Sequence, residues 1–489
     1  MAERKGIYFG TINASASDLL SESSRLAQEK HAQLLRRIEA EKRARNISVP
    51  TSILSRLELE AEETGFVHQV LQDIQQQGGR PLEAHFTTAG VATSITATAD
   101  TQSASGSPGA NQEDQLFYIP IKNEELKQAR TAMFAMSATR TAERLRQQRL
   151  QRSARPEENV GDSSADATDR HAAELYGTAQ KMINVSSQNG DVRPISSVQF
   201  ASDGAHVATG SWSGLVKVWD ASNASEVKVF RGHEDRVTGV AWHPSNAFSD
   251  MSDTSDAVCL CSGSADSTAR LWSASRAEPI AVLKGHRARL GKVAFHPSGD
   301  YVGTTSFDHT WRLWDVSTAQ ELLLQEGHYK EVYALTFQND GALAATGDLD
   351  GIGRVWDLRS GKAIMSLQGH SKQILSMSFS ANGYLLASGS DDRSVRIWDL
   401  RQRKCSYMIP AHSSLVSEVK FSPASSELLL SASYDASVKL WRTRDWKLMA
   451  TLKGHDGKVM SADFAPDERH VVSCGFDRTF KFWAHEREF

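Results

Sequence analysis

Six stretches of the chain each contain a histidine, a serine or threonine, an aspartate and a tryptophan in the same order. A hydroxyl, an imidazole and a carboxylate brought together are the groups of a nucleophilic triad, in which the imidazole accepts the hydroxyl proton. A hydrolase is therefore one hypothesis to weigh. The quartets are His233, Ser262, Asp266 and Trp272; His286, Thr304, Asp308 and Trp314; His328, Thr346, Asp350 and Trp356; His370, Ser388, Asp392 and Trp398; His412, Ser431, Asp435 and Trp441; and His455, Ser473, Asp477 and Trp483.

Repetition favours a structural function for these quartets. Catalysis needs one such set, whereas six copies suit a network that satisfies buried polar groups and holds tight turns in register. We therefore expect no catalytic residue among them. The histidines recur one per repeat and no glycine-rich phosphate loop follows a strand into a helix, so we expect neither a metal site nor a cofactor.

The tryptophans indicate which elements position the quartets. They fall at 219, 272, 314, 356, 398, 441 and 483, and a period of about 42 is typical of a four-stranded propeller blade. We predict an all-β, seven-bladed WD-repeat propeller over residues 181–489, preceded by a mostly helical, partly disordered N-terminal region. The segment Lys181–Val185 is expected to complete the seventh blade, because a paired edge leaves no open sheet.

Two blades depart from the pattern. Blade one has Ser213 in place of the aspartate and no Gly-His ahead of it, so we expect packing and the closing strand to hold it. Blade two contains extra residues from Ser245 to Asp256, rich in serine and aspartate. A solvated loop and a loop phosphorylated at Ser252 or Ser255 both remain open interpretations.

The residue before each turn aspartate is the best candidate for partner contact. These positions share one rim of the propeller, together with cations three residues after a repeat histidine. A ring of aromatic and cationic side chains there suits a contact surface, and packing against the neighbouring blade is the alternative. The residues are Trp212, Phe307, Tyr434 and Phe476, with Arg236, Arg289 and Lys458.

Two repeats end in Trp-Asp-Leu-Arg, at Trp356–Arg359 and Trp398–Arg401. Such endings are similar to those of substrate receptors that dock on cullin ubiquitin ligases. A substrate receptor is therefore the alternative function. The competing interpretation is an arginine that pairs with a nearby carboxylate, and short motifs of this kind often arise without function.

The region ahead of the propeller divides by composition. Residues 1–86 show helical periodicity, 87–115 are expected to be a disordered linker, 116–155 form a basic helical segment, and 156–180 are a further linker. The chain has 489 residues, a formal net charge of -4 and four cysteines. We find neither an apolar run long enough for a bilayer nor a secretory signal, and so few cysteines favour the cytosol or nucleus.

The basic segment is the main electrostatic feature. Its arginines include Arg140, Arg144, Arg146, Arg149 and Arg152. At helical spacing they surround most of the helix, which suits a segment lying in an RNA or acidic-protein groove better than one packed on the propeller. A solvated helix that keeps the N-terminal region soluble is the alternative.

Blade-by-blade sequence adds a resemblance to a known family. The segments that carry it are Gly190–Ser196, Trp212–Leu215, Gly303–Thr305, Trp311–Asp315, Gln325–His328, Gly353–Arg359, Trp398–Arg403, Pro410–His412 and Gly457–Met460, with Arg43–Thr51 and Leu126–Arg130 outside the propeller. In this order they resemble the U4/U6 small nuclear ribonucleoprotein WD-repeat splicing factors, the pre-mRNA-processing factor four family. The family's small N-terminal motif is only echoed, at Gly78–Leu82 and His85–Phe86.

The resemblance implies a nuclear, non-catalytic function. Members of the family help to hold the U4/U6 RNA particle together and support its joining with U5. They do so beside a companion protein of the processing factor three family and, in many organisms, a cyclophilin. The resemblance implies these partners and the U4 and U6 RNAs for this chain, and no membrane.

Overall fold

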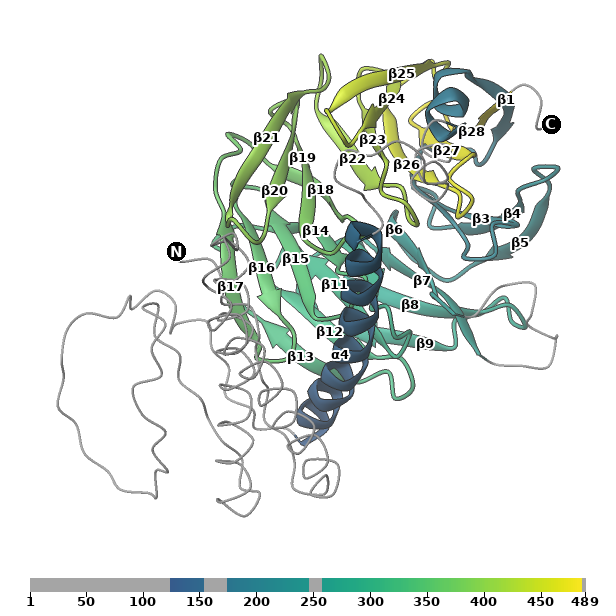
Figure 1. Ribbon diagram of the computed structural model, residues 1–489. Helices are drawn as coiled ribbons and strands as arrows, with labels where there is room; N and C mark the ends of the chain where they lie inside the picture. The colour runs from purple at the N-terminus through teal and green to yellow at the C-terminus, as the bar shows by residue number, and fades with distance from the viewer. Residues whose placement is uncertain (1–123, 154–173, 246–256, 486–489) are drawn as a thin grey trace, which may run out of the picture. The chain divides into compact units, whose positions relative to one another are not determined.

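The computed structural model describes residues 124–153, 174–245 and 257–485 (Figure 1). The predicted regions 1–86 and 87–115, most of the 156–180 linker and the blade-two loop with Ser252 and Ser255 lie outside these ranges. No helix in the described part is long and apolar enough to cross a membrane.

Seven four-stranded antiparallel sheets form the propeller, as predicted. The strands of blades one to three are β2 (Ile195–Phe200), β3 (His206–Ser211), β4 (Val216–Asp220) and β5 (Glu226–Phe230); β6 (Val237–Trp242), β7 (Val258–Ser264), β8 (Thr268–Ser273) and β9 (Ala281–Lys284); β10 (Leu290–Phe295), β11 (Tyr301–Ser306), β12 (Trp311–Asp315) and β13 (Glu321–Gln325). Those of blades four to six are β14 (Val332–Phe337), β15 (Leu343–Asp348), β16 (Gly353–Asp357) and β17 (Lys362–Leu367); β18 (Ile374–Phe379), β19 (Leu385–Ser390), β20 (Ser394–Asp399) and β21 (Lys404–Pro410); β22 (Val416–Phe421), β23 (Leu428–Ser433), β24 (Ser437–Arg442) and β25 (Lys447–Lys453).

The seventh blade closes the ring with a strand from the other end of the domain. Its own strands are β26 (Val459–Phe464), β27 (Val471–Gly475) and β28 (Thr479–His485), and β1 (Met182–Asn189) pairs antiparallel with β28. The predicted closing strand is thereby confirmed, although it runs further than Val185. The innermost strands of the first and seventh blades, β2 and β26, also contact each other, which completes the ring.

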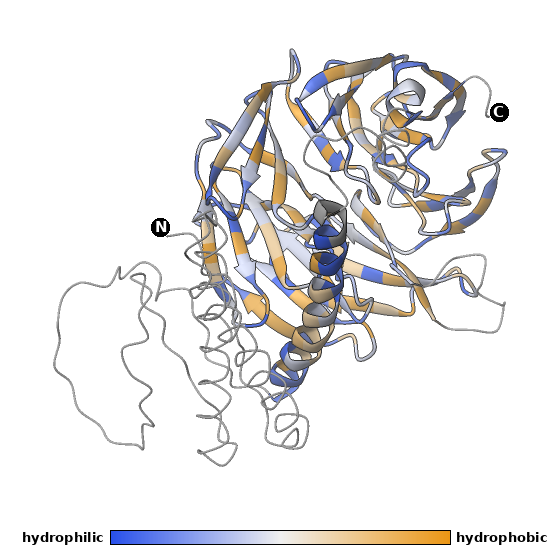
Figure 2. Cartoon of the chain, viewed as in Figure 1, coloured by the Kyte–Doolittle hydropathy of each residue, from blue (hydrophilic) through white to orange (hydrophobic). Residues whose placement is uncertain are grey.

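The core lies between neighbouring sheets. Figure 2 shows polar and apolar residues alternating along the strands, so that each sheet offers an apolar face to the next blade. Close approach explains a recurring glycine in the second strand of most blades. A Cβ on Gly389 would lie 2.5 Å from Cγ2 of Val419 in the next blade, too close for any other residue without a shift.

The helix α4 (Glu124–Ser153) packs against the propeller (Figure 1). Glu124 and Glu125 in its first turn complement the positive end of the helix dipole. Leu126, Ala129 and Met133 recur at helical spacing and are buried in one cluster with side chains of blades three and four. The expectation that this segment lies apart from the propeller is therefore wrong, because those three side chains give it an apolar stripe.

Candidate functional site

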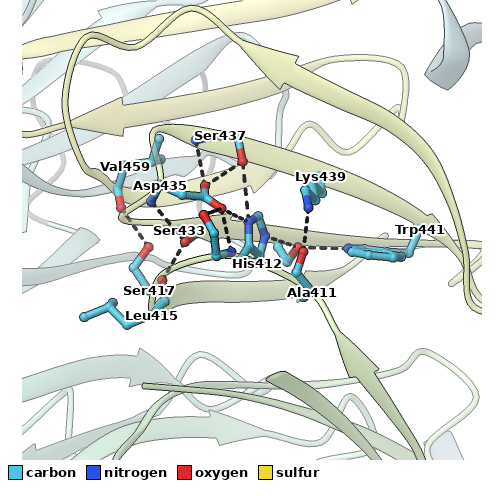
Figure 3. A network of polar contacts seen from close by, with 12 residues as sticks. Ala411, His412, Leu415, Ser417, Ser433, Asp435, Ser437, Lys439, Trp441 and Val459 are labelled. Atoms are coloured by element: carbon cyan, nitrogen blue, oxygen red, sulfur yellow. Dashed lines mark hydrogen bonds and ion pairs between the residues drawn. The ribbon is translucent and has the colours of Figure 1, made fainter. Parts of the chain in front are cut away.

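Blades two, three, five, six and seven each bring together the four side chains named from the sequence. In blade five, Asp392 Oδ2 lies 2.7 Å from His370 Nδ1, and Ser388 Oγ lies 2.7 Å from His370 Nε2 and 2.8 Å from Trp398 Nε1. Figure 3 shows the same arrangement in blade six around His412. The remaining sets are His233, Ser262, Asp266 and Trp272; His286, Thr304, Asp308 and Trp314; and His455, Ser473, Asp477 and Trp483.

The ionised aspartate determines the direction of every hydrogen bond in a quartet. The carboxylate can only accept, so the histidine Nδ1–H donates to it, and Nε2 accepts from the hydroxyl. The hydroxyl oxygen in turn accepts the tryptophan Nε1–H. Burial lowers the pKa of His233, His328 and His412, which keeps these imidazoles neutral as the chain of bonds requires.

The aspartate also holds a tight turn. Asp392 Oδ1 accepts bonds from the amide and hydroxyl of Ser394, and the residue between them, Arg393, has a φ of 67°. A non-glycine residue in this left-handed region is strained, and the carboxylate compensates with two bonds. In blade six partial burial acts to raise the pKa of Asp435, but bonds from Ser437 and His412 outweigh it and lower the pKa to about 2.

These hydroxyls are poorly placed for nucleophilic catalysis. Ser388 and Thr304 are fully buried, and each oxygen already accepts a tryptophan N–H while donating to histidine. A substrate carbonyl has no route to either atom in this arrangement. The quartets thus have the hydrogen bonds of a catalytic triad, but a substrate cannot reach their hydroxyls. The geometry therefore gives no support to the hydrolase hypothesis.

Blade four requires a correction. The carboxylate bonded to His328 belongs to Asp348 (2.9 Å), not to Asp350, which is exposed. Asp348 stands at the end of β15, where five of the other six blades have a serine before the turn. It binds the histidine and also holds the turn. Its Oδ1 accepts the amides of Asp350 and Ile352 across the turn. The spacing from the tryptophan in the other quartets points to Asp350, and the path of the turn places Asp348 against His328 instead.

Blade one replaces the pair rather than losing it. Asp191 occupies the histidine position and accepts a hydrogen bond from Ser213, which occupies the aspartate position. Trp219 Nε1 still donates to Thr209 Oγ1 at 2.8 Å. Partial burial acts to raise the pKa of Asp191, but hydrogen bonds from Ser211, Ser213 and the Val192 amide outweigh it and lower the pKa. From the sequence we expected no partner for Ser213 and missed Asp191. Asp191 precedes the first strand of its blade by the same number of residues as each repeat histidine does.

The rim residues form cation–aromatic pairs. Arg289 lies 3.8 Å from the ring centroid of Phe307, Lys458 lies 4.9 Å from that of Tyr434, and Arg236 lies 5.5 Å from that of Trp212. The Trp212 and Phe476 rings meet edge-on at 5.6 Å across blades one and seven. Packing between blades and partner contact are thus compatible, since Phe476 touches a neighbour and remains 46% exposed.

The arginines of α4 separate into two groups. Arg140 donates to the carbonyls of Asn339 and Pro297, and Arg144 binds Asp340 and donates to the Asn382 carbonyl at 2.7 Å. Arg146 and Arg149 are exposed on the helix. The side chain of Arg152 lies outside the described residues.

The two Trp-Asp-Leu-Arg arginines bind the aspartate of their own motif. Arg359 Nε lies 3.0 Å from Asp357 Oδ1, and Arg401 Nη2 lies 3.0 Å from Asp399 Oδ2. The Arg401 guanidinium also stacks at 3.7 Å over Tyr384. These bonds match the ion-pair interpretation, and nothing in the geometry favours the cullin alternative.

The central cavity, of about 540 Å³, contains four charges that pair with one another. Lys292 binds Glu418 across the ring at 2.5 Å, and Lys420 binds Asp463 at 2.9 Å. These two ion pairs connect different blades. Because each pair has no net charge, the cavity offers no excess charge to an ionic ligand. Within the described part of the chain, no cluster of three or more side chains could hold a metal ion.

Comparison with known proteins gives one family and several relatives. The family model "WD domain, G-beta repeat" matches residues 184–220, 224–273, 277–315, 320–357, 361–399, 403–442 and 446–484. The chain is 50% identical over 128 residues to an uncharacterised WD-repeat protein of Schizosaccharomyces pombe, covering 26% of this chain and 27% of the relative. It is 37% identical over 260 residues to the U4/U6 small nuclear ribonucleoprotein Prp4 of Mus musculus, 52% of this chain and 47% of the relative.

The U4/U6 small nuclear ribonucleoprotein PRP4 of Saccharomyces cerevisiae is 31% identical over 135 residues, 26% of this chain and 27% of the relative. The chain thus spans about half or less of the length of the curated relatives it matches. The name shared by the mouse and Saccharomyces cerevisiae relatives confirms the resemblance seen from the blade sequences.

Proposed function

The chain belongs to the WD-repeat family of β-propeller proteins, and from that premise we propose that it is a non-catalytic scaffold of the spliceosomal U4/U6 particle. The observation that carries the proposal is similarity to proteins named U4/U6 small nuclear ribonucleoprotein Prp4. The buried quartets support it, because they stabilise a surface rather than perform a reaction. The proposed site of action is the nucleus.

The proposal includes partners of two kinds. Protein partners, a processing factor three relative and a cyclophilin, are those that the resemblance implies. The rim around Trp212 and Phe476 is the proposed protein contact, since aromatic and arginine side chains dominate binding energy at such surfaces. The exposed Arg146 and Arg149 are the proposed contact to the U4/U6 RNA, and the same particle joined to U5 is the proposed larger assembly.

Immunoprecipitation of the tagged full chain, followed by RNA sequencing and mass spectrometry, tests the proposal. Enrichment of U4 and U6 RNA above a tagged, unrelated WD-repeat protein is the expected result. Recovery of a cullin adaptor without these RNAs would instead support the substrate-receptor alternative. Recovery of neither would leave the scaffold proposal without its main consequence and overturn it.

A further inference from the structure

The docking of α4 depends on a carboxylate far away in the sequence. Asp340 lies in the turn between β14 and β15, is 4% exposed, and accepts bonds from Arg144 and from the Thr141 hydroxyl. A buried carboxylate without a cation would be costly, so the pair locks together two groups 196 residues apart in the chain.

Around this pair the helix touches the corresponding turn in three successive blades. Arg140 reaches Pro297 in blade three and Asn339 in blade four, and both Arg144 and Gln148 reach Asn382 in blade five. All three acceptors are backbone carbonyls whose positions the turns fix. The helix is therefore held in one orientation as well as in one place.

That orientation determines which arginines face solvent. On a helix with 3.6 residues per turn, Arg146 and Arg149 lie roughly on the side opposite to Arg144 and Gln148. Because Arg144 and Gln148 bind the propeller, Arg146 and Arg149 point outwards, and both are exposed. An undocked helix would fix neither of them relative to the blades.

We propose that Asp340 is a positioning residue for RNA: by docking α4 it presents Arg146 and Arg149 as a pre-ordered contact for a phosphodiester backbone. The inference rests on the proposed RNA contact and adds its mechanism. Ordering a helix and its arginines at the moment of binding costs conformational entropy. Docking on the propeller supplies that order before RNA arrives.

The inference has a consequence opposite to simple electrostatics. Replacing Asp340 with asparagine removes a negative charge, which by itself would strengthen attraction to RNA. If positioning matters more than this charge, Asp340→Asn weakens RNA binding instead. The direction of the change therefore decides between the two accounts.

The experiment measures binding of the full chain to a fluorescent U4/U6 RNA duplex across a salt series. Asp203→Asn is the matched control, because Asp203 occupies the same position in the blade-one turn, whereas Asp340 is the one that binds α4. We expect Asp340→Asn to lower affinity about fivefold or more, the lower range of coupling between sites, and Asp203→Asn to leave it within about twofold. The double variant Arg146→Ser, Arg149→Ser should reduce the salt slope by about 2, one for each phosphate contact.

Two outcomes overturn different statements. If the arginine double variant binds as the wild type does, the RNA contact through these side chains is wrong, whatever the immunoprecipitation recovers. If it weakens binding but Asp340→Asn leaves affinity unchanged or higher, the contact stands and the positioning by Asp340 is wrong.

A second variant separates undocking from damage to blade four. Met133, on the face of α4 that packs against the propeller, is 1% exposed, and Met133→Gln keeps the length and helix propensity of the side chain while removing its apolar contact. It alters neither the charge nor the Asp340 turn. Affinity for the duplex should fall as in Asp340→Asn, and the melting temperature of the propeller should not change. Faster amide exchange in α4 with unchanged affinity would overturn the inference.

Discussion

At the level of single residues, the seven blades use three different polar networks at the same place in the fold. Five blades use the histidine–aspartate pair at the positions named from the sequence, blade four uses an aspartate two residues earlier, and blade one uses Asp191 with Ser213. What these networks share is a carboxylate that satisfies donors of a tight turn. Each tight turn therefore needs a carboxylate as acceptor, but the position of that carboxylate in the sequence can vary.

Blade four offers a test with its own control. Asp348→Ala leaves the His328 Nδ1–H and two turn amides without an acceptor, so we expect unfolding to cost about 1–3 kcal/mol less. Asp350→Ala removes an exposed carboxylate and should change stability by no more than about 0.5 kcal/mol. Urea unfolding of the two variants measures the difference, and equal losses would contradict the assignment of Asp348.

The buried histidines predict a pH dependence of stability. Burial lowers the pKa of His233, His243, His296, His328 and His412 in the folded protein. The unfolded chain binds protons at these residues below about pH 6.5, whereas the folded protein does so only at lower pH. Stability is therefore complete above about pH 6.5 and is lost as pH falls towards the folded values. Urea midpoints at pH 7.5 and 5.5 check this, and a higher midpoint at pH 5.5 would contradict it.

At the level of elements, closure of the ring depends on one strand. β1 occupies the outer edge of blade seven and pairs with β28 from Met182 to Asn189. Without it β28 would expose a row of unpaired backbone groups, which invites aggregation. The strand therefore stabilises the domain mainly through its backbone pairing, since Met182 is its one buried side chain.

Deletion of β1 from the full chain should cause insolubility or a large fall in melting temperature. Removing eight residues within 157–173, ahead of the strand, is a control of the same length as β1 and should leave melting near the wild-type value. Differential scanning calorimetry of both proteins measures the effect. Equal melting would show that blade seven does not need the strand.

At the level of the whole molecule, the two proposed contact sites lie on opposite faces of the propeller. In an antiparallel sheet successive turns alternate between the two ends of the strands. The rim uses the turns between second and third strands, and α4 binds turns between first and second strands. A protein on the rim and an RNA beside α4 could therefore bind at the same time, as a scaffold requires.

The rim predicts loss of a protein partner without loss of RNA. Phe476→Ser removes an exposed ring of the proposed contact, and we expect binding of that partner to weaken at least about fivefold. Tyr329→Ser is the control, because Tyr329 is 71% exposed on the loop after His328 and is not one of the rim residues. Quantitative mass spectrometry after immunoprecipitation measures both, and equal recovery of every partner would contradict the assignment of the rim.

The spacing of residues along the chain was enough to predict the blades and most of the quartets. Tryptophans about 42 residues apart, with alternating stretches between them, specify a repeated sheet. The hydroxyl residue and the aspartate stand at fixed distances before each tryptophan, as Ser388 and Asp392 do before Trp398. The closing strand also followed, because a ring with an open edge is disfavoured. These features depend on local spacing, which a sequence displays directly.

The exceptions among the quartets and the docking of α4 depend on contacts between distant parts of the chain. Asp348 and Asp350 carry the same side chain, and the path of one turn determines that Asp348 is the one that binds His328. Whether Arg144 faces RNA or the propeller depends on Asp340, which nothing within the helix sequence indicates. Long-range pairs of this kind arise because the fold brings distant turns to one surface, and their geometry exists only once the ring has closed.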